Sequence, residues 1–232
     1  MAKSIALSHS RLSTYNQCPR KFKLQFLDKA FPQEDADKSP HLVRGNNVHK
    51  ALEGYVVKRL SGQNDIQPSS LKEVETTKPL IDRLFQEFDM IMPEAQVAVD
   101  SEYKKVEWFD SNAYYRVIMD IIGKGDSTAF VGDYKTGKIN DYSGYGGQLH
   151  LTAAITFCVF EDVQDVTAAY LYVDHQKVNK IKFHRSELPA QIQHFDAEHV
   201  KVNSDKEFKP VPNDFCKWCP ATKAQCPYSR KI

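Results

Sequence analysis

The sequence lacks any apolar run long enough to cross a membrane. No stretch approaches the about 18 consecutive apolar residues that mark a membrane-spanning helix. The N-terminal residues MAKSIALSHS are too polar and too short for a secretory signal peptide. Internal repeats are also missing. We therefore expect a globular protein of the cytoplasm, without contact with a membrane.

The chain also has almost no net charge. Its 31 Lys and Arg residues oppose 30 Asp and Glu residues, which gives a net charge of +1. This balance does not exclude a nucleic-acid partner, because a carboxylate-rich metal site offsets basic contact surface elsewhere. Two local basic clusters, Arg20-Lys21-Lys23 and Lys177-Lys180-Lys182-Arg185, are either such a surface or ordinary solvated faces.

With 232 residues the chain can bury one substantial core, so we expect a single domain, 1–232. Its parts are a helical region (1–92), a core (93–205) and a cysteine-rich tail (206–232). Apolar spacing predicts helices over 8–27 with a break at Pro19, and over 42–60, 70–92, 145–160 and 186–203. Alternating or apolar runs predict strands over 96–108, 114–122, 128–135, 166–174 and 178–184. Loops are expected over 30–40, 61–69 and 142–147. This order predicts an α/β or α+β fold with a mixed, largely antiparallel sheet flanked by helices.

Asp133 and Lys135 lie at the end of the apolar segment AFVGDYKTGK. Side chains two residues apart in a strand project to the same face. A carboxylate can then hold a divalent cation while the ammonium orients water or offsets the charge of a phosphate. The backbone carbonyl of Tyr134 is a further possible ligand. The same acid-x-Lys spacing recurs in Glu102-Tyr-Lys104 and Glu207-Phe-Lys209, which we interpret as surface ion pairs.

Asp120 is the second unusual acid, since VIMDIIG surrounds it with apolar residues. A carboxylate in such a segment is costly to bury unless it is paired or bound to a metal. A hairpin between the two strands brings Asp120 and Asp133 to one end of the sheet. Two converging carboxylates suit Mg²⁺ or Mn²⁺. The alternative is an Asp at an exposed strand position.

Two more residues are candidates for the same site. His49 shares a helix face with Glu53 and is either a metal ligand or part of an ordinary surface pair. Gln148 opens a helix and either contacts the attacking water or a phosphate, or is a plain N-terminal residue of that helix.

Five cysteines are present, and four of them form a pattern. Cys216, Cys219 and Cys226 are closely spaced in CKWCPATKAQC, and Cys18 is the obvious fourth ligand. Cys158, within ITFCVF, is most simply a buried apolar residue. In a cytosolic protein the four cysteines indicate a metal site rather than disulfides, and unrelated free thiols are the alternative.

Together these motifs resemble the RecB-like branch of the PD-(D/E)XK nucleases, with a restriction-endonuclease-like core. The matching segments are GNNVHKALE, VIMDIIG, VGDYKTGK and GGQLHLTAA, in the family's order and within residues 10–228. The resemblance implies His49, Asp120 and Asp133 as metal ligands, Lys135 as the catalytic lysine and Gln148 as a polar contact in the site. The sequence departs from the family at Thr152, where a Tyr is common.

The cysteine pattern is similar to that of the iron–sulfur nucleases, namely the AddB-type helicase–nucleases and the CRISPR-associated RecB-like exonucleases. This implies a [4Fe–4S] cluster on Cys18, Cys216, Cys219 and Cys226, although spacing alone also permits Zn²⁺.

These features predict a Mg²⁺- or Mn²⁺-dependent deoxyribonuclease of DNA processing, recombination or repair. We expect an exonuclease acting on single-stranded or frayed DNA ends, with possible recombination or replication partner proteins. Arg20, Lys21, Lys23 and Lys138 are candidate DNA contacts. The alternatives are a structure-specific endonuclease, a non-catalytic nucleic-acid-binding module, and a structural or assembly protein held together by its metal.

Overall fold

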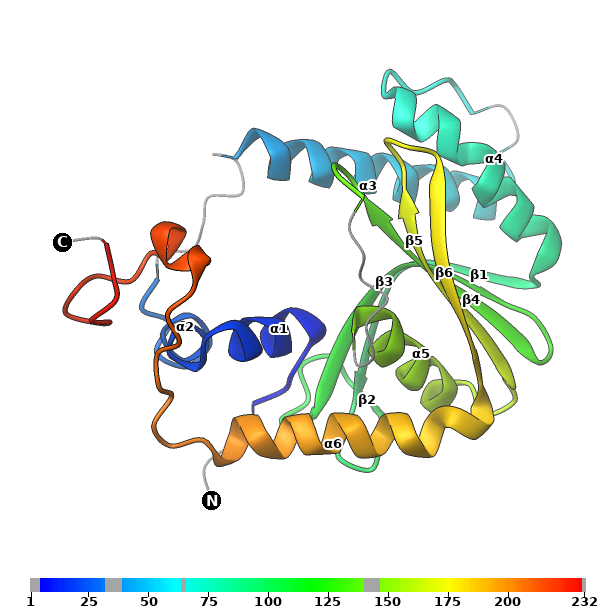
Figure 1. The fold of residues 1–232 in the computed structure, drawn as a ribbon. Coiled ribbons are helices and arrows are strands. Elements are labelled where there is room, and N and C mark those ends of the chain that lie inside the picture. Colours follow the sequence, from blue (N-terminus) through cyan, green and yellow to red (C-terminus); the bar gives the residue numbers. More distant parts are fainter. Residues whose placement is uncertain (1–4, 32–38, 64–65, 140–146, 231–232) are drawn as a thin grey trace.

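The computed structural model describes residues 5–31, 39–63, 66–139 and 147–230. Its centre is a six-stranded sheet with the order β2-β1-β3-β4-β5-β6 (Figure 1). The strands are β1 (Met90–Val99), β2 (Lys105–Val106), β3 (Tyr115–Lys124), β4 (Thr128–Lys135), β5 (Asp165–Tyr172) and β6 (Lys177–His184). Among these six strands, β4 and β5 pair in parallel and the other neighbours are antiparallel; α5 (Gln148–Val159) connects β4 to β5. The predicted mixed, largely antiparallel sheet is therefore confirmed.

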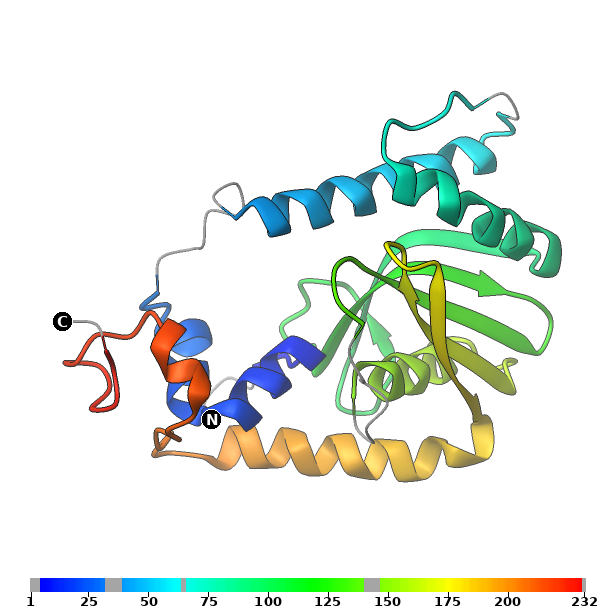
Figure 2. The same cartoon turned by 45° about the horizontal axis from the view of Figure 1, so that its top comes forward.

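Helices cover both faces of this sheet, as Figures 1 and 2 show. On one face, α3 (Pro40–Leu60) and α4 (Lys72–Glu87) bury Val48, Leu52 and Ile81 against β3, β4 and β5. On the other face lie α1 (His9–Gln17), α5 and α6 (Leu188–Ser204). Burial of these two apolar layers is the main favourable contribution to folding.

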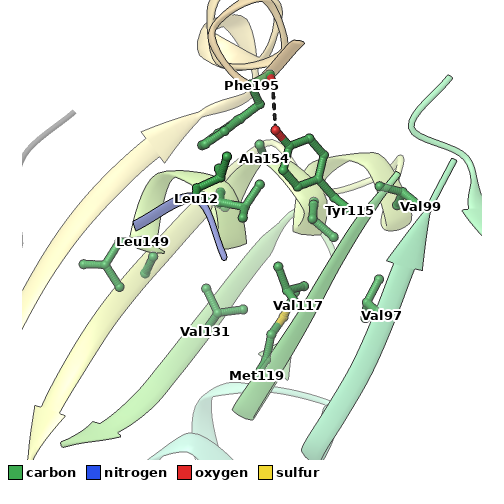
Figure 3. Close-up of a cluster of buried hydrophobic side chains, with 14 of the residues drawn as sticks. Leu12, Val97, Val99, Tyr115, Val117, Met119, Val131, Leu149, Ala154 and Phe195 are labelled. Atoms are coloured by element: carbon green, nitrogen blue, oxygen red, sulfur yellow. Dashed lines mark hydrogen bonds between the residues drawn. The ribbon is translucent and has the colours of Figure 1, made fainter. Parts of the chain in front are cut away.

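A buried hydrogen bond connects α6 to the sheet within the second layer. The hydroxyl of Tyr115 donates a 2.7 Å hydrogen bond to the carbonyl of Phe195, among the apolar side chains drawn in Figure 3. Both residues are fully buried. A buried hydroxyl needs a partner, so this bond fixes α6 on the start of β3.

The sequence prediction is wrong at both ends of β1. The helix expected over 70–92 ends at Glu87, because Met90–Met92 pair with β3 instead. The strand expected over 96–108 is interrupted after Val99. There the carboxylate of Asp100 accepts the backbone N–H groups of Glu102 and Lys104, which closes a turn.

The N-terminal helix breaks at Pro19, as predicted. Cys18 is extended there, and α2 (Pro19–Phe22) begins directly after it, followed by a π-helical turn, Lys23–Leu27. The C-terminal tail contains η4, a 3₁₀ helix over Asp214–Trp218. A shorter 3₁₀ helix, η3 (Arg185–Glu187), precedes α6. Most of the predicted loops over 30–40 and 142–147 lie outside the described residues, as does part of the loop over 61–69.

Within the described ranges, every helix is too short or too polar to cross a membrane.

Candidate active site

Three carboxylates follow one another across β1, β3 and β4. The register pairs Pro93 with Ile121 and Ala95 with Met119, so Glu94 lies opposite Asp120. Beyond the last β3–β4 pair, Ile121–Gly132, the same register places Asp120 opposite Asp133. Cross-strand neighbours share a face of the sheet, so the fold itself aligns these acids.

Asp133, Lys135 and Gln148 form one connected group. The ammonium of Lys135 lies 2.6 Å from Oδ2 of Asp133, and it donates to Oε1 of Gln148 at 3.2 Å. Gln148 in turn donates through Nε2 to Oδ1 of Asp133 at 2.5 Å. The prediction that Asp133 and Lys135 share a face is confirmed, and the first residue of α5 fixes both side chains.

His49 reaches the same end of the sheet from α3. Its Nδ1 is 3.4 Å from Oδ1 of Asp120, and its Nε2 is 2.9 Å from the carbonyl of Tyr134. The other oxygen of Asp120 accepts the backbone N–H of Tyr134 at 2.6 Å. The structure thus brings together His49, the Tyr134 carbonyl and both predicted carboxylates.

Glu94 is a site residue that the sequence prediction missed. One ligand atom each from His49, Glu94 and Asp120 lies within 4.8 Å of the other two, which is close enough to hold one ion. Glu94 has a left-handed φ of 45°, a conformation that costs about 1–3 kcal/mol and is concentrated at functional sites. Glu94 has apolar neighbours, as Asp120 does, and this pattern could have identified it. It was missed because it follows residues 88–92, which were predicted to continue the helix.

Burial and mutual repulsion shift the titration of these acids. Burial raises the pKa of Asp133, and Lys135 offsets only part of that rise because Asp120 repels a second negative charge. Burial, together with Asp120, also raises the pKa of Glu94. For His49, burial lowers the pKa, but the hydrogen bond and charge of Asp120, together with the charge of Asp133 and the carbonyl of Tyr134, raise it by more. A divalent cation among these groups would relieve the repulsion.

The turn after Lys135 is anchored from outside the strand. Gly137, with φ of 91°, donates its N–H to Asp174 at 2.7 Å, and its carbonyl lies 2.8 Å from Nε2 of His175. Asp174 also pairs with Arg44 at 2.5 Å, and Arg44 contacts Glu73. This network connects α3, α4 and the β5–β6 turn to the end of β4.

A second residue absent from the prediction is His9, the first residue of α1. Burial lowers the pKa of His9, and the charge of Lys135 lowers it further, so the imidazole is within electrostatic range of the ammonium. No pattern around His9 distinguishes it in the sequence.

The remaining predicted pairs and contacts lie elsewhere. Glu102–Lys104 and Glu207–Lys209 are exposed ion pairs, as expected. Lys23 pairs with Asp28. Lys138 is exposed, three residues after Lys135.

The four predicted cysteine ligands line a single pocket between α2 and the C-terminal tail. Arg20 and Lys21 line the same pocket. Backbone N–H groups point at two of the sulfurs: Val211 donates to Cys18 at 3.5 Å and Asn213 to Cys216 at 3.4 Å. No three cysteine sulfurs of the described chain lie within 4.8 Å of one another. Cys158, in α5, is partly buried, and burial raises the pKa of its thiol to about 11.

The amino-acid sequence matches the model of the PD-(D/E)XK nuclease superfamily over residues 6–227. The chain belongs to this superfamily. The PD-(D/E)XK nuclease described here is therefore a hydrolase whose superfamily uses divalent metals, and its sheet has the expected restriction-endonuclease-like arrangement.

No curated protein matches the sequence of this nuclease. Among solved structures, the one titled "Crystal structure of SSO0001" is similar with 13% identity and a TM-score of 0.45. The match covers 93% of this chain and 82% of that chain. A similarity this low has no bearing on function.

Proposed function

We propose that this nuclease hydrolyses phosphodiester bonds in DNA with the help of Mg²⁺ or Mn²⁺. The observation that carries the proposal is the row Glu94, Asp120 and Asp133, with the ammonium of Lys135 only 2.6 Å from Asp133. Carboxylates concentrated at one place repel one another and favour a hard divalent cation. The adjacent lysine supplies the positive charge that a phosphate requires.

The ligands of the proposed ion are His49, Glu94 and Asp120, which already lie together. Asp133 and the carbonyl of Tyr134 are the further oxygen donors beside them. When bound, the ion supplies a nucleophilic water and stabilises negative charge on the phosphate. Because histidine binds metal in its neutral form, we expect the affinity of the site to rise with pH through the raised pKa of His49.

We propose that Lys135 and Gln148 position the reacting groups and stabilise the charge that develops on the phosphate. The ammonium of Lys135 orients the attacking water and donates to the phosphate as its charge develops. The hydrogen bonds of Gln148 to Lys135 and Asp133 hold these two side chains in fixed relative positions. Preset geometry of this kind avoids reorganisation during the reaction.

We further propose that the protein is a RecB-like exonuclease acting in DNA processing, recombination or repair. The motif order given above and the basic residues Arg20 and Lys21, at the far end of α1 from His9, support this. The test compares linear single-stranded DNA, linear duplex, closed circular DNA and RNA, each with Mg²⁺ or Mn²⁺. Cleavage of linear but not circular DNA is expected, cleavage of circles would favour an endonuclease, and cleavage of RNA alone would contradict the substrate assignment.

For Cys18, Cys216, Cys219 and Cys226 we propose a [4Fe–4S] cluster. The four residues share one pocket, and backbone N–H groups donate to two of the sulfurs. Arg20 lines the pocket too, and it has a buried Nε without a hydrogen-bond partner among the described residues. Its positive charge would offset part of the negative charge that four thiolate ligands carry.

Zinc is the alternative to the cluster, because it also takes four thiolate ligands. A [4Fe–4S] cluster binds each thiolate to a different iron. We expect anaerobically purified protein to be brown and to contain about four irons. Colourless protein with one zinc would contradict the cluster.

A further inference from the structure

Two aromatic side chains of η4 are unusually open to solvent. Phe215 is 55% exposed and Trp218 is 66% exposed, and their ring centroids are 6.2 Å apart. The ammonium of Lys217 lies 4.0 Å from the centroid of the Trp218 ring. Exposing large rings to water is costly, so this pair is a candidate for a binding surface.

The rings are attached to a firmly held part of the chain. The side chain of Asn213 accepts the backbone N–H of Phe215 at 3.0 Å. Its amide nitrogen donates to the carbonyl of Gln17, the last residue of α1, at 3.1 Å. The aromatic pair is therefore fixed to the helix that leads back to the sheet.

The charge around the pair favours an anionic partner. Residues 206–230 contain five Lys or Arg and two Asp or Glu, a net charge of +3 against +1 for the whole chain. One of the two acids, Glu207, is already paired with Lys209. The ammonium of Lys217 lies against the Trp218 ring, so the aromatic surface itself carries a positive charge. Rings interleaved with cations are the pattern of surfaces that bind single-stranded nucleic acid.

The distance between η4 and the catalytic lysine sets how long a DNA strand must be to contact both. α1 begins next to the sheet, where Leu7 pairs with Tyr115 of β3 and where burial and the charge of Lys135 lower the pKa of His9. Its C-cap is Cys18, which lines the same pocket as Phe215. Figures 1 and 2 show this helix running from the sheet to α2 and the C-terminal tail. Nine helical residues span about 14 Å, the length of about four stacked nucleotides.

We propose that Phe215 and Trp218 form a stacking platform for the bases of a single DNA strand whose scissile phosphate lies at the active site. This inference rests on the proposed DNA-cleaving function and adds a second contact to it. Lys217 would meet the phosphates of the same strand. A base that stacks on an aromatic ring contributes roughly 5- to 150-fold in affinity.

The two tryptophans of the chain make the platform directly observable. In a Trp108→Phe, Asp133→Asn protein, Trp218 is the only fluorophore of its kind and cleavage is blocked. Titration with dT12 is expected to quench Trp218, whereas dT3 is too short to reach from the active site. Phe215→Ala with Trp218→Ala should weaken dT12 binding, followed by anisotropy of a labelled strand, by roughly 5- to 150-fold per lost base.

Phe109 supplies a matched control. It is 86% exposed, lies in the loop between β2 and β3, and is not among the residues that line the cysteine pocket. Phe109→Ala should leave dT12 affinity unchanged, and Trp218→Phe, which keeps a ring on the same backbone, should bind like the parent. Far-ultraviolet circular dichroism and thermal unfolding of each variant report whether the fold has formed.

The outcomes separate the platform from the proposed function. If the wild-type protein cleaves DNA but the alanine variants bind dT12 as tightly as the parent, the platform is refuted and the nuclease remains. If the alanine variants lose binding to another protein but keep their affinity for DNA, the platform is refuted as well. If the wild-type protein neither binds nor cleaves DNA under any metal condition, the proposed function fails together with the platform.

Discussion

The backbone N–H of Tyr134 donates a 2.6 Å hydrogen bond to Oδ2 of Asp120. This bond joins β4 to the carboxylate of β3 at the point where the pairing of the two strands ends, after Ile121–Gly132. Asp120 therefore has two tasks: it closes the sheet locally, and it presents its other oxygen to His49.

Replacing Asp120 should separate these two tasks. Asp120→Asn keeps an oxygen that can accept the Tyr134 N–H, and it removes a charge that repels Asp133 and Glu94. Asp120→Ala leaves that N–H without a partner, which costs about 1–3 kcal/mol. In urea unfolding with EDTA, we expect the Asn variant to be at least as stable as wild type and the Ala variant less stable by that amount. Equal destabilisation by both changes would contradict the bonding role.

Glu94 should contribute to metal affinity. Glu94→Gln removes one charged ligand from the group with His49 and Asp120. We expect Mn²⁺ binding, measured calorimetrically, to weaken by roughly 10- to 100-fold or more, with activity partly recovered at high metal concentration. Glu53→Gln is the control. The charge of Glu53 raises the pKa of Glu94, but Glu53 is not among the three grouped ligands. If both variants weaken binding equally, only the overall charge matters.

Acid should destabilise the fold through His199. Burial lowers the pKa of His199 to about 4, and its ring stacks on Tyr114. The unfolded chain, with a pKa near 6.5, binds this proton more readily, so unfolding becomes easier as the pH falls from about 6.5 to about 4. His199→Phe should flatten the pH dependence of the free energy of unfolding in this window, whereas replacing the exposed His184 by Gln should not. An unchanged slope in His199→Phe would count against the assignment.

Gly132 should be required directly before Asp133. An added Cβ would lie 2.9 Å from side-chain atoms of both Ile121 and Leu171. Gly132→Ala should therefore lower the free energy of unfolding by about 1–3 kcal/mol. The same change at Gly54 in α3 meets nothing within 4 Å and should stabilise by about 0.5–1 kcal/mol. Thermal unfolding of the two variants distinguishes them, and a shift of the same sign in both would show that packing is not the cause.

The sequence was sufficient to predict elements with strong periodicity, such as β4, α3 and α6, to within a few residues. It was insufficient around residue 90, because Met90–Met92 continue the apolar spacing of α4 and only their pairing with β3 makes them a strand. Tertiary pairing overrode local pattern there. That error also concealed Glu94.

The candidate site was predictable where one motif carried several groups, as in Asp133-Tyr134-Lys135. Asp120 was recognisable because apolar residues surround it. The contribution of Glu94 depends on the register of β1 against β3, and that of His9 on the packing of α1 against the sheet. Such contacts between distant segments leave no local pattern in a single sequence.

The most direct test of the account is metal-dependent cleavage of labelled linear DNA by the wild-type protein and by Asp133→Asn. Asn at this position keeps the size of the side chain and removes the charge beside Lys135. Glu207→Gln, in the exposed pair with the same acid-x-Lys spacing, is the matched control. The account predicts cleavage with Mg²⁺ or Mn²⁺ that EDTA abolishes, a loss of at least about 100-fold in Asp133→Asn, and full activity in Glu207→Gln. Undiminished cleavage by Asp133→Asn, or cleavage in EDTA, would contradict it.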